Sequence, residues 1–318
     1  MSFSKLTTRL RQFGGMHLLR QYAQIGVLWT GIKAFFHCIV KKKSFKTIYS
    51  ELLTKVEPYL VRRYKSVMIE RKVFYHVQEL EQKKANLVWF CWLQGLENAP
   101  AIVRSCYNSL KQNLPDRELK VIDADNWREF VDLPEYIVEK WEGKRIPAAN
   151  FSDLLRLQLL VKYGGTWIDS TVLCTGSSNL DRYLDADLFL FQYSKQGNLP
   201  LSISNWFISS CSNNEVLLVL RDMLFAYWKD YDCVLDYYIF HLFFAVLSKE
   251  YPEQMLAMPY ANSRDSLVLL NHWNEQFDKE KWDRLTARVT FHKLSARPDK
   301  ATVKASGNFY NEILRIYS

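Results

Sequence analysis

Three charged side chains lie close together in the sequence, on a short predicted helix and at the end of the strand that follows it. Asp153 and Arg156 are three residues apart on the helix, so they can pair with each other or bind a ligand. Asp169 ends an apolar strand, where a carboxylate is costly to bury unless it meets a metal ion, a cation or several donors. These residue types indicate a site for a charged ligand. The alternative is a surface ion pair and a carboxylate that caps a turn.

The spacing of apolar residues and glycines predicts how these side chains are positioned. One side of the helix is buried through leucines at helical spacing, Leu154, Leu157 and Leu160. Gly164 and Gly165 suit a left-handed helix stop. In the strand that follows, alternate side chains point to the same side, namely Trp167, Asp169 and Thr171.

A resemblance to a known family rests on two linked motifs, Ser152-Asp153-x-x-Arg156 and Tyr163-Gly164-Gly165-x-Trp167-x-Asp169. Their types, order and spacing resemble the signature of capsular polysaccharide synthesis glycosyltransferases, which are relatives of the GT-A enzymes. The resemblance covers roughly residues 85–295. In that family the first acid and the arginine help to hold a nucleotide-sugar, and a D-x-D pair binds a divalent cation on its diphosphate. This sequence departs from the pattern at Thr171, which stands where the family has the second aspartate.

The resemblance implies a role for each matching position. For binding the nucleotide-sugar it implies Trp92, Gln94, Gly95, Ser152, Asp153, Arg156, Gly165 and Lys293. As catalytic residues it implies Asp169, Asp236 and Lys293. As ligands of Mn²⁺ or Mg²⁺ it implies Asp169, Thr171 and His292. As acceptor contacts it suggests Asn205 and Trp206.

Structural alternatives stay open for several of these residues. Trp92 also suits a core position and Gly95 a turn, and the region of Asn205 and Trp206 also suits a buried strand. His241 follows Asp236 on an apolar helix, where a lone histidine is more often a core residue. The segment Asp123-Ala-Asp-Asn126 after the second strand can meet a ribose or supply the N-cap of the helix that begins at Trp127, and the cap is favoured.

The chain beyond residue 80 has the pattern of a globular α/β domain. Hydrophobic residues make up 48% and charged residues 24%, which is ordinary for a globular protein. Strands are expected over residues 86–92, 119–123, 187–193 and 204–209, and helices over 101–112, 214–229 and from 236. With the resemblance, this predicts a GT-A-like, Rossmann-type mixed sheet flanked by helices in a domain over residues 81–318. Cys91, Cys106 and Cys174 are expected in its core, and the cysteine spacing favours a reducing cytoplasm.

Residues 1–80 form a basic arm that is expected to be helical. They carry fifteen Lys and Arg against four Asp and Glu, a net charge of +11, whereas the whole chain has +8. The apolar stretch 22–40, followed by three lysines at 41–43, is a poor transmembrane span and a better helix in the headgroup region. A helical hairpin packed on the rest of the chain is the alternative. Nucleic acid is not expected as a partner, because aromatics are not interleaved with the basic residues.

The resemblance implies a metal-assisted hexosyltransferase. It would move a sugar from a UDP-hexose to a lipid-linked or oligosaccharide acceptor in capsular or extracellular polysaccharide synthesis, at the inner face of the cell membrane. The alternative is a non-catalytic protein that binds nucleotide-sugar or glycan, which Thr171 supports. No P-loop, G-x-S-x-G, H-E-x-x-H or G-x-G-x-x-G motif is present, so kinase, esterase, zincin and classical dinucleotide functions lack support.

Overall fold

The computed structural model describes residues 16–33, 45–176, 180–194 and 202–318, which group into two compact units. The first unit comprises Met1–Glu79, Asp132–Leu157 and Glu215–Leu247. The second comprises Leu80–Val131, Gln158–Asn214 and Ser248–Ser318. The units therefore differ from the predicted division into 1–80 and 81–318, because the N-terminal segment is grouped with two later helical segments.

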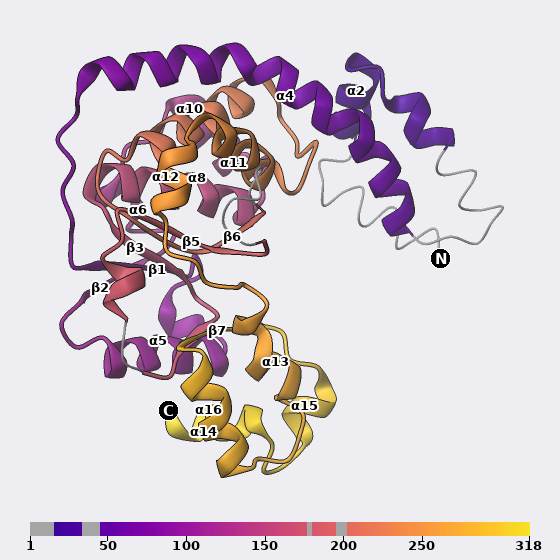
Figure 1. The fold of residues 1–318 in the computed structure, drawn as a ribbon. Coiled ribbons are helices and arrows are strands. Elements are labelled where there is room, and N and C mark those ends of the chain that lie inside the picture. The colour runs from indigo at the N-terminus through magenta and orange to yellow at the C-terminus, as the bar shows by residue number, and fades with distance from the viewer. Residues whose placement is uncertain (1–15, 34–44, 177–179, 195–201) are drawn as a thin grey trace. The chain divides into compact units, whose positions relative to one another are not determined.

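The first unit is helical. Its helices are α2 (Met16–Gln24), α4 (Phe45–Gln78), α7 (Glu135–Glu142), α10 (Glu215–Asp230), the start of α8 (Ala148–Tyr163) and most of α11 (Ile239–Glu250). The long helix α4 buries one residue in every four along one side, Val56, Leu60, Tyr64 and Met68. The Tyr64 ring meets the Phe243 ring edge-on with centroids 5.4 Å apart, and its hydroxyl donates to Asp230 over 3.0 Å. Helix α4 thus packs along α10 (Figure 1).

The apolar stretch 22–40 does not form one continuous helix. Helix α2 ends at Gln24, and Gly26 takes φ +74°, a conformation that interrupts a right-handed helix. A new helical segment begins at residue 28, while residues 34–44, including the three lysines at 41–43, lie outside the described part of the chain. Within the described ranges, no helix is long and apolar enough to cross a membrane.

The second unit is built on a five-stranded mixed sheet with strand order β2-β1-β3-β6-β5. Its strands are β1 (Leu87–Cys91), β2 (Glu118–Ile122), β3 (Gly165–Asp169), β5 (Leu188–Gln192) and β6 (Ile203–Ser210). Strands β2, β1 and β3 are parallel, whereas β6 is antiparallel to both β3 and β5. Strands β1 and β5 are apolar runs because both of their faces are buried, and β3 is buried up to its last residue, Asp169. The predicted α/β class, a mixed sheet flanked by helices, is confirmed.

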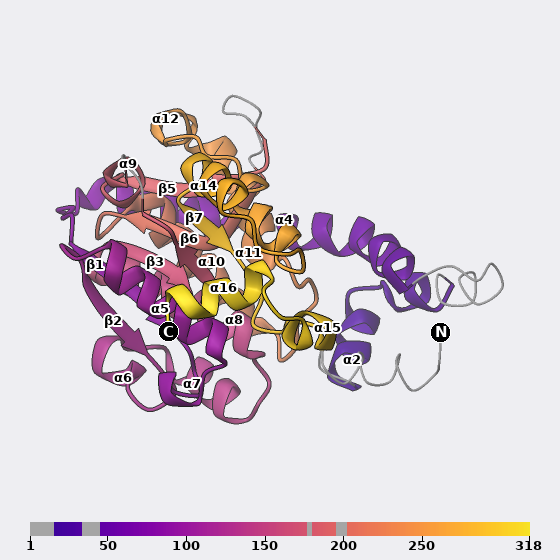
Figure 2. The same ribbon diagram turned by 90° about the horizontal axis from the view of Figure 1, so that it is seen from below.

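A short two-stranded ribbon and several helices complete the second unit. The ribbon pairs β4 (Val172–Cys174) with β7 (Phe291–Lys293) in antiparallel orientation. The helices are α5 (Ala101–Asn113), α6 (Trp127–Phe130), α9 (Asp181–Leu184), α12 (Pro252–Ala257), α13 (Val268–His272), α14 (Lys279–Arg288), α15 (Lys300–Lys304), α16 (Phe309–Ile316), and the 3₁₀ turns Leu96–Asn98 and Asp265–Leu267. Helix α5 packs against β4. It also packs against α16 (Figure 2). As predicted, Cys91, Cys106 and Cys174 are buried free cysteines.

The backbone conformation after α8 requires glycine at two successive positions. Gly164 has φ +74° and Gly165 φ +89°, and a Cβ at Gly165 would lie 2.5 Å from the Leu87 carbonyl oxygen of β1. Trp89 Nε1 donates to the Gly164 carbonyl over 2.9 Å, so the helix end is tied to β1. The glycines therefore let helix α8 turn directly into β3 and let β3 pair closely with β1, as the sequence predicts for a helix stop.

Gly165→Ala should lower the thermal stability of the protein. A left-handed alanine costs about 1–2 kcal/mol, and the contact with the Leu87 oxygen requires the backbone to shift as well. Differential scanning fluorimetry would measure the change in Tm. Gly31→Ala is the matched control, because its Cβ would meet only the flexible tip of Leu52 at 3.2 Å. Equal Tm values for both variants would contradict this account.

Candidate functional site

The carboxyl ends of the three parallel strands meet at one edge of the sheet. In the strand register, Cys91 of β1 pairs with both Ile122 of β2 and Asp169 of β3. The residues that follow these strand ends, among them Trp92 and Asp123, therefore gather on the same edge as Asp169. In open α/β sheets, ligands bind at the carboxyl ends of the strands. We take this edge as the candidate site of the second unit.

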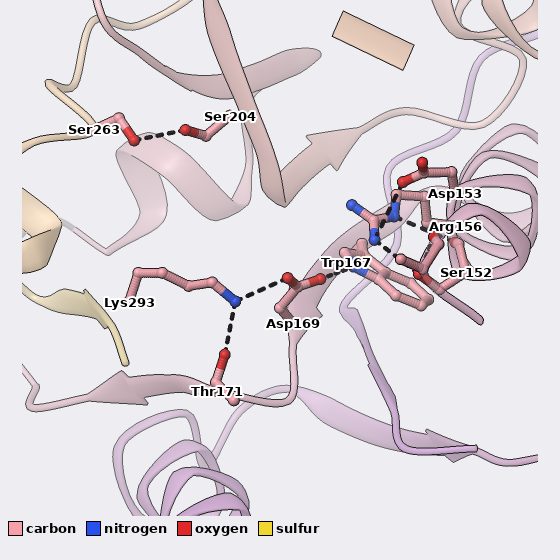
Figure 3. Close-up of polar contacts among 10 residues, drawn as sticks. Ser152, Asp153, Arg156, Trp167, Asp169, Thr171, Ser204, Ser263 and Lys293 are labelled. Carbon is pink, nitrogen blue, oxygen red and sulfur yellow. Dashed lines mark hydrogen bonds and ion pairs between the residues drawn. The ribbon is translucent and has the colours of Figure 1, made fainter. Parts of the chain in front are cut away.

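Asp169 forms the polar centre of this edge (Figure 3). Its Oδ1 accepts a hydrogen bond from Trp167 Nε1 over 2.9 Å, and its Oδ2 accepts one from Lys293 Nζ over 2.9 Å. The same ammonium donates to Thr171 Oγ1 over 2.6 Å. The side chains of Asp169 and Lys293 are 25% and 23% exposed, so the pair reaches solvent, whereas Trp167 is buried. The structure thus brings together the predicted residues Asp169, Thr171 and Lys293.

The ribbon fixes Lys293 beside the motif. Lys293 is the register partner of Val172, and the backbone N–H of Leu294 donates to the Thr171 carbonyl over 2.8 Å. These bonds hold the Lys293 backbone on a strand next to Thr171. A side chain supported in this way is held more accurately than one on a loop.

The predicted metal ligands are not assembled in the structure. Successive side chains of a strand point to opposite faces. His292 therefore points away from Lys293 and Asp169, and it is fully buried, with Nε2 3.3 Å from Thr175 Oγ1. Across the described part of the chain, no group of three or more His, Cys, Asp or Glu side chains is placed to hold a metal ion.

The donor set of this edge does not fit a divalent cation held by the protein. Its two remaining ligand candidates, Asp169 and Thr171, both bond the Lys293 ammonium. A magnesium ion would have to contact the same two oxygens at about 2.1 Å, and it would then lie against a positive charge. For this reason, the arrangement of these side chains in the structure differs from the predicted set of metal ligands.

Burial lowers the pKa of His292 to about 3, so this histidine is neutral in the folded protein. An unfolded histidine has a pKa near 6.5, so the unfolded state binds more protons between pH 3 and 6.5. The stability that comes from keeping His292 neutral is fully present above pH 6.5, and it is lost as the pH falls below that value. His292 should therefore make the wild type about 1.4 kcal/mol less stable at pH 5.5 than at pH 7.5, and His292→Leu should remove this part of the difference. Urea unfolding at the two pH values would measure it. An unchanged pH difference in the variant would show that His292 is not buried in its neutral form.

The loop after β1 also lies at this edge. Trp92 is half-buried, and its backbone N–H donates to Ile122 of β2 over 3.0 Å. Gln94 is exposed, and Gly95 forms a turn with φ +80°. This placement is compatible with a ligand contact by Trp92 or Gln94. The positive φ of Gly95 explains why glycine is found there.

The structure bears on the predictions for two further residues, Asp123 and Gly165. Asp123 Oδ1 accepts from the backbone N–H groups of Asp125 and Asn126, so it stabilises the turn before α6. The N-cap of α6 is Asn126, the last residue of the predicted capping segment. Gly165 lies at the opposite end of β3 from Asp169, roughly 13 Å away at about 3.3 Å per residue. The structure therefore gives Gly165 a packing role and places it away from the candidate site.

The first unit contains the other half of the motif. Arg156 Nε donates to the Ser152 carbonyl over 3.2 Å, and Nη2 donates to Ser152 Oγ over 3.1 Å (Figure 3). Nη2 also lies 3.4 Å from Asp153 Oδ1. The side chains of Arg156 and Asp153 are only 5% and 11% exposed. The predicted ion pair is formed, but it is buried rather than on the surface, and a buried pair adds little stability compared with apolar side chains.

Asp236 and His241 also belong to the first unit. Asp236 is buried, and its Oδ1 accepts from the Tyr238 backbone N–H over 2.8 Å, at the turn that leads into α11. Burial, and to a lesser degree the charge of Arg156, lowers the pKa of His241 to about 4. Asp236 therefore has a structural role at the start of α11, and its predicted catalytic role stays a prediction.

The predicted acceptor contacts lie on β6. Trp206 is buried and stacks on Phe191 with ring centroids 4.4 Å apart, so it is a core residue as in the structural alternative. Asn205 is half-buried on the same strand.

Sequence reasoning missed three contacts of the site. The bond from Trp167 to Asp169 was detectable, because residues two apart on a strand lie on one side. The bonds from Lys293 to Asp169 and to Thr171 join residues 124 and 122 positions apart, and no local pattern signals them.

Comparisons with known proteins place this chain in a family. Residues 37–313 match the family described as capsular polysaccharide synthesis protein. The chain therefore belongs to this family, as the motifs predicted. A comparison with curated protein sequences finds no match. Among solved structures, the chain is similar to one titled PaToxG Glycosyltransferase, with 11% identity, a TM-score of 0.38, and coverage of 73% of this chain and 93% of that chain.

Proposed function

We propose that this protein is a glycosyltransferase of capsular or extracellular polysaccharide synthesis. It moves a hexose from a nucleotide-sugar, a UDP-sugar in our proposal, to a lipid-linked or oligosaccharide acceptor. The family membership supports the role in polysaccharide synthesis. The observation that carries the chemistry is the contact of Lys293 with Asp169 and Thr171 at the carboxyl edge of the parallel strands.

The chemistry of sugar transfer explains why such a pair is useful. The bond between the anomeric carbon and the diphosphate breaks, and negative charge grows on the leaving diphosphate. A cationic side chain that is already in position stabilises this charge where it develops. Lys293 is partly exposed and is held by a strand, so it fits this role. We further propose that the Ser152, Asp153 and Arg156 cluster contributes to binding the nucleotide-sugar.

The test is release of free nucleotide from a panel of UDP-, GDP- and dTDP-sugars, each with Mn²⁺ and with chelator. We expect release from one donor, which would identify the sugar, and a faster rate with a lipid-linked acceptor. Donor binding without release, even with acceptors present, would instead support the non-catalytic binding protein, for which Thr171 is the supporting residue. No release and no donor binding would refute both functions.

We also propose that the first unit contacts the cytoplasmic face of the membrane peripherally. Helix α4 exposes Ile69, Val73 and Val77 at four-residue spacing, with exposed fractions of 48%, 59% and 75%. Residues spaced in this way lie on one side of a helix. The exposed Lys65 is on the same helix, and the N-terminal 80 residues carry a net charge of +11. Apolar side chains with basic neighbours favour binding to an anionic lipid surface.

Val73→Glu/Val77→Glu should reduce co-sedimentation with anionic vesicles at least about tenfold, because it replaces apolar contacts with repelling charges. The matched control is Leu256→Glu/Val303→Glu, which changes residues of similar exposure, 62% and 52%, in the second unit. The control should bind vesicles like the wild type. Equal binding by both double variants would refute a membrane surface on α4.

A further inference from the structure

We infer that the Lys293 ammonium is the cation of this site and takes the place that a divalent metal has where the motif carries two carboxylates. The protein would then bind a nucleoside diphosphate without a metal ion. This inference rests on the proposed function, because it assigns how the same site meets the donor's diphosphate.

The Lys293 ammonium occupies the position that a metal ion bound to this motif would need. Lys293 Nζ lies 2.9 Å from Asp169 Oδ2 and 2.6 Å from Thr171 Oγ1, so it contacts both side chains that the motif offers at the first and last positions of D-x-T. A metal ion bound by these two oxygens would occupy the same space. His292, the third predicted ligand, lies on the opposite face of β7 and is fully buried.

The charges of Asp169 and Lys293 balance without a metal ion. Two carboxylates and one divalent cation sum to zero, and so do one carboxylate and one ammonium. Thr171 in place of an aspartate removes one negative charge, and Lys293 supplies the single positive charge that Asp169 then balances. A divalent ion added to this pair would leave an excess of two positive charges before any diphosphate binds.

The Lys293 ammonium can still reach a ligand. Its side chain is 23% exposed, and an ammonium has three N–H donors. Among the residues that the structure describes, Asp169 and Thr171 take two of them. The third can donate to a phosphate oxygen, as lysines do in other phosphate sites.

The first experiment measures nucleotide binding by isothermal titration calorimetry in the presence of EDTA, with UDP, GDP and dTDP as probes. We expect the wild type to bind one of them with the same affinity in EDTA and in Mn²⁺. Lys293→Met should weaken this binding by about 10- to 100-fold, as expected for loss of a charged hydrogen bond. Lys300→Met, a lysine at the start of α15, is the matched control and should bind like the wild type.

The second experiment tests the metal directly and needs no activity. Electron paramagnetic resonance of free Mn²⁺ should show no stoichiometric uptake by the wild type. Thr171→Asp/Lys293→Met restores two carboxylates and removes the ammonium, so it should bind Mn²⁺ at least about tenfold more tightly than the wild type. Thermal melting would confirm that each variant is folded.

The outcomes separate this inference from the proposed function. Binding that needs Mn²⁺, together with Mn²⁺ uptake by the wild type that Asp169→Asn abolishes, would overturn the inference and leave the glycosyltransferase intact. A folded double variant without a gain in Mn²⁺ affinity would also overturn it, since lysine and metal would not share the same oxygens. No nucleotide binding with or without Mn²⁺ would refute the proposed function and the inference with it.

Discussion

The Asp169→Asn enzyme should release nucleotide from its sugar donor about 100- to 1,000-fold more slowly than the wild type. Asp169 Oδ2 holds the Lys293 ammonium, and the substitution removes the charge that orients it. Losing one positioned group that stabilises developing charge costs an enzyme about this factor in kcat. The loss should appear mainly in kcat, because the stabilised charge is largest in the transition state.

Three comparisons distinguish this positioning role from a general loss of structure. Asp116→Asn removes an exposed carboxylate elsewhere in the second unit and should keep wild-type activity. Asp169→Glu keeps the charge and should recover part of the rate. The double variant Asp169→Asn/Lys293→Met should be no slower than the slower single variant, because residues that act as a unit are not additive. Additive losses would mean that the two side chains act separately.

Arg156→Met should destabilise the protein by about 3–5 kcal/mol. It leaves the Asp153 carboxylate in a buried position without the guanidinium that lies 3.4 Å from it. Breaking a buried pair from one side costs about this much, whereas replacing both members with apolar side chains can be neutral. Asp153→Leu/Arg156→Met should therefore recover a large part of the lost stability, as measured by urea unfolding.

Donor binding decides whether this buried pair serves stability or function. If the cluster binds the nucleotide-sugar, the double variant regains stability but stays at least about tenfold weaker in donor binding. If it is only structural, the double variant regains both. Lys140 offers a control in the same unit, since it is a buried cation that bonds the Tyr231 carbonyl over 3.0 Å. Lys140→Met should lower stability and leave donor affinity per folded molecule unchanged.

Much of the second unit could be predicted from the sequence, because its signals are local. The apolar runs around Val88 and Phe189 became buried strands, and the helical pattern from residue 101 became α5. Gly164 and Gly165 could be placed because few residues other than glycine adopt their backbone conformation. The motif also indicated the family correctly, since its residue types and spacing are unusual in combination.

The sequence by itself thus determined the class of fold, the family and the residues that carry charge at the site. The tertiary structure decided which of these side chains meet. Lys293 reaches Asp169 across 124 positions of sequence, through a ribbon register that no local pattern contains. A shift of that register by one residue would direct His292 towards Asp169 instead, because side chains alternate between the two faces of a strand. The choice between a lysine and a metal ligand at this site therefore depends on long-range strand pairing.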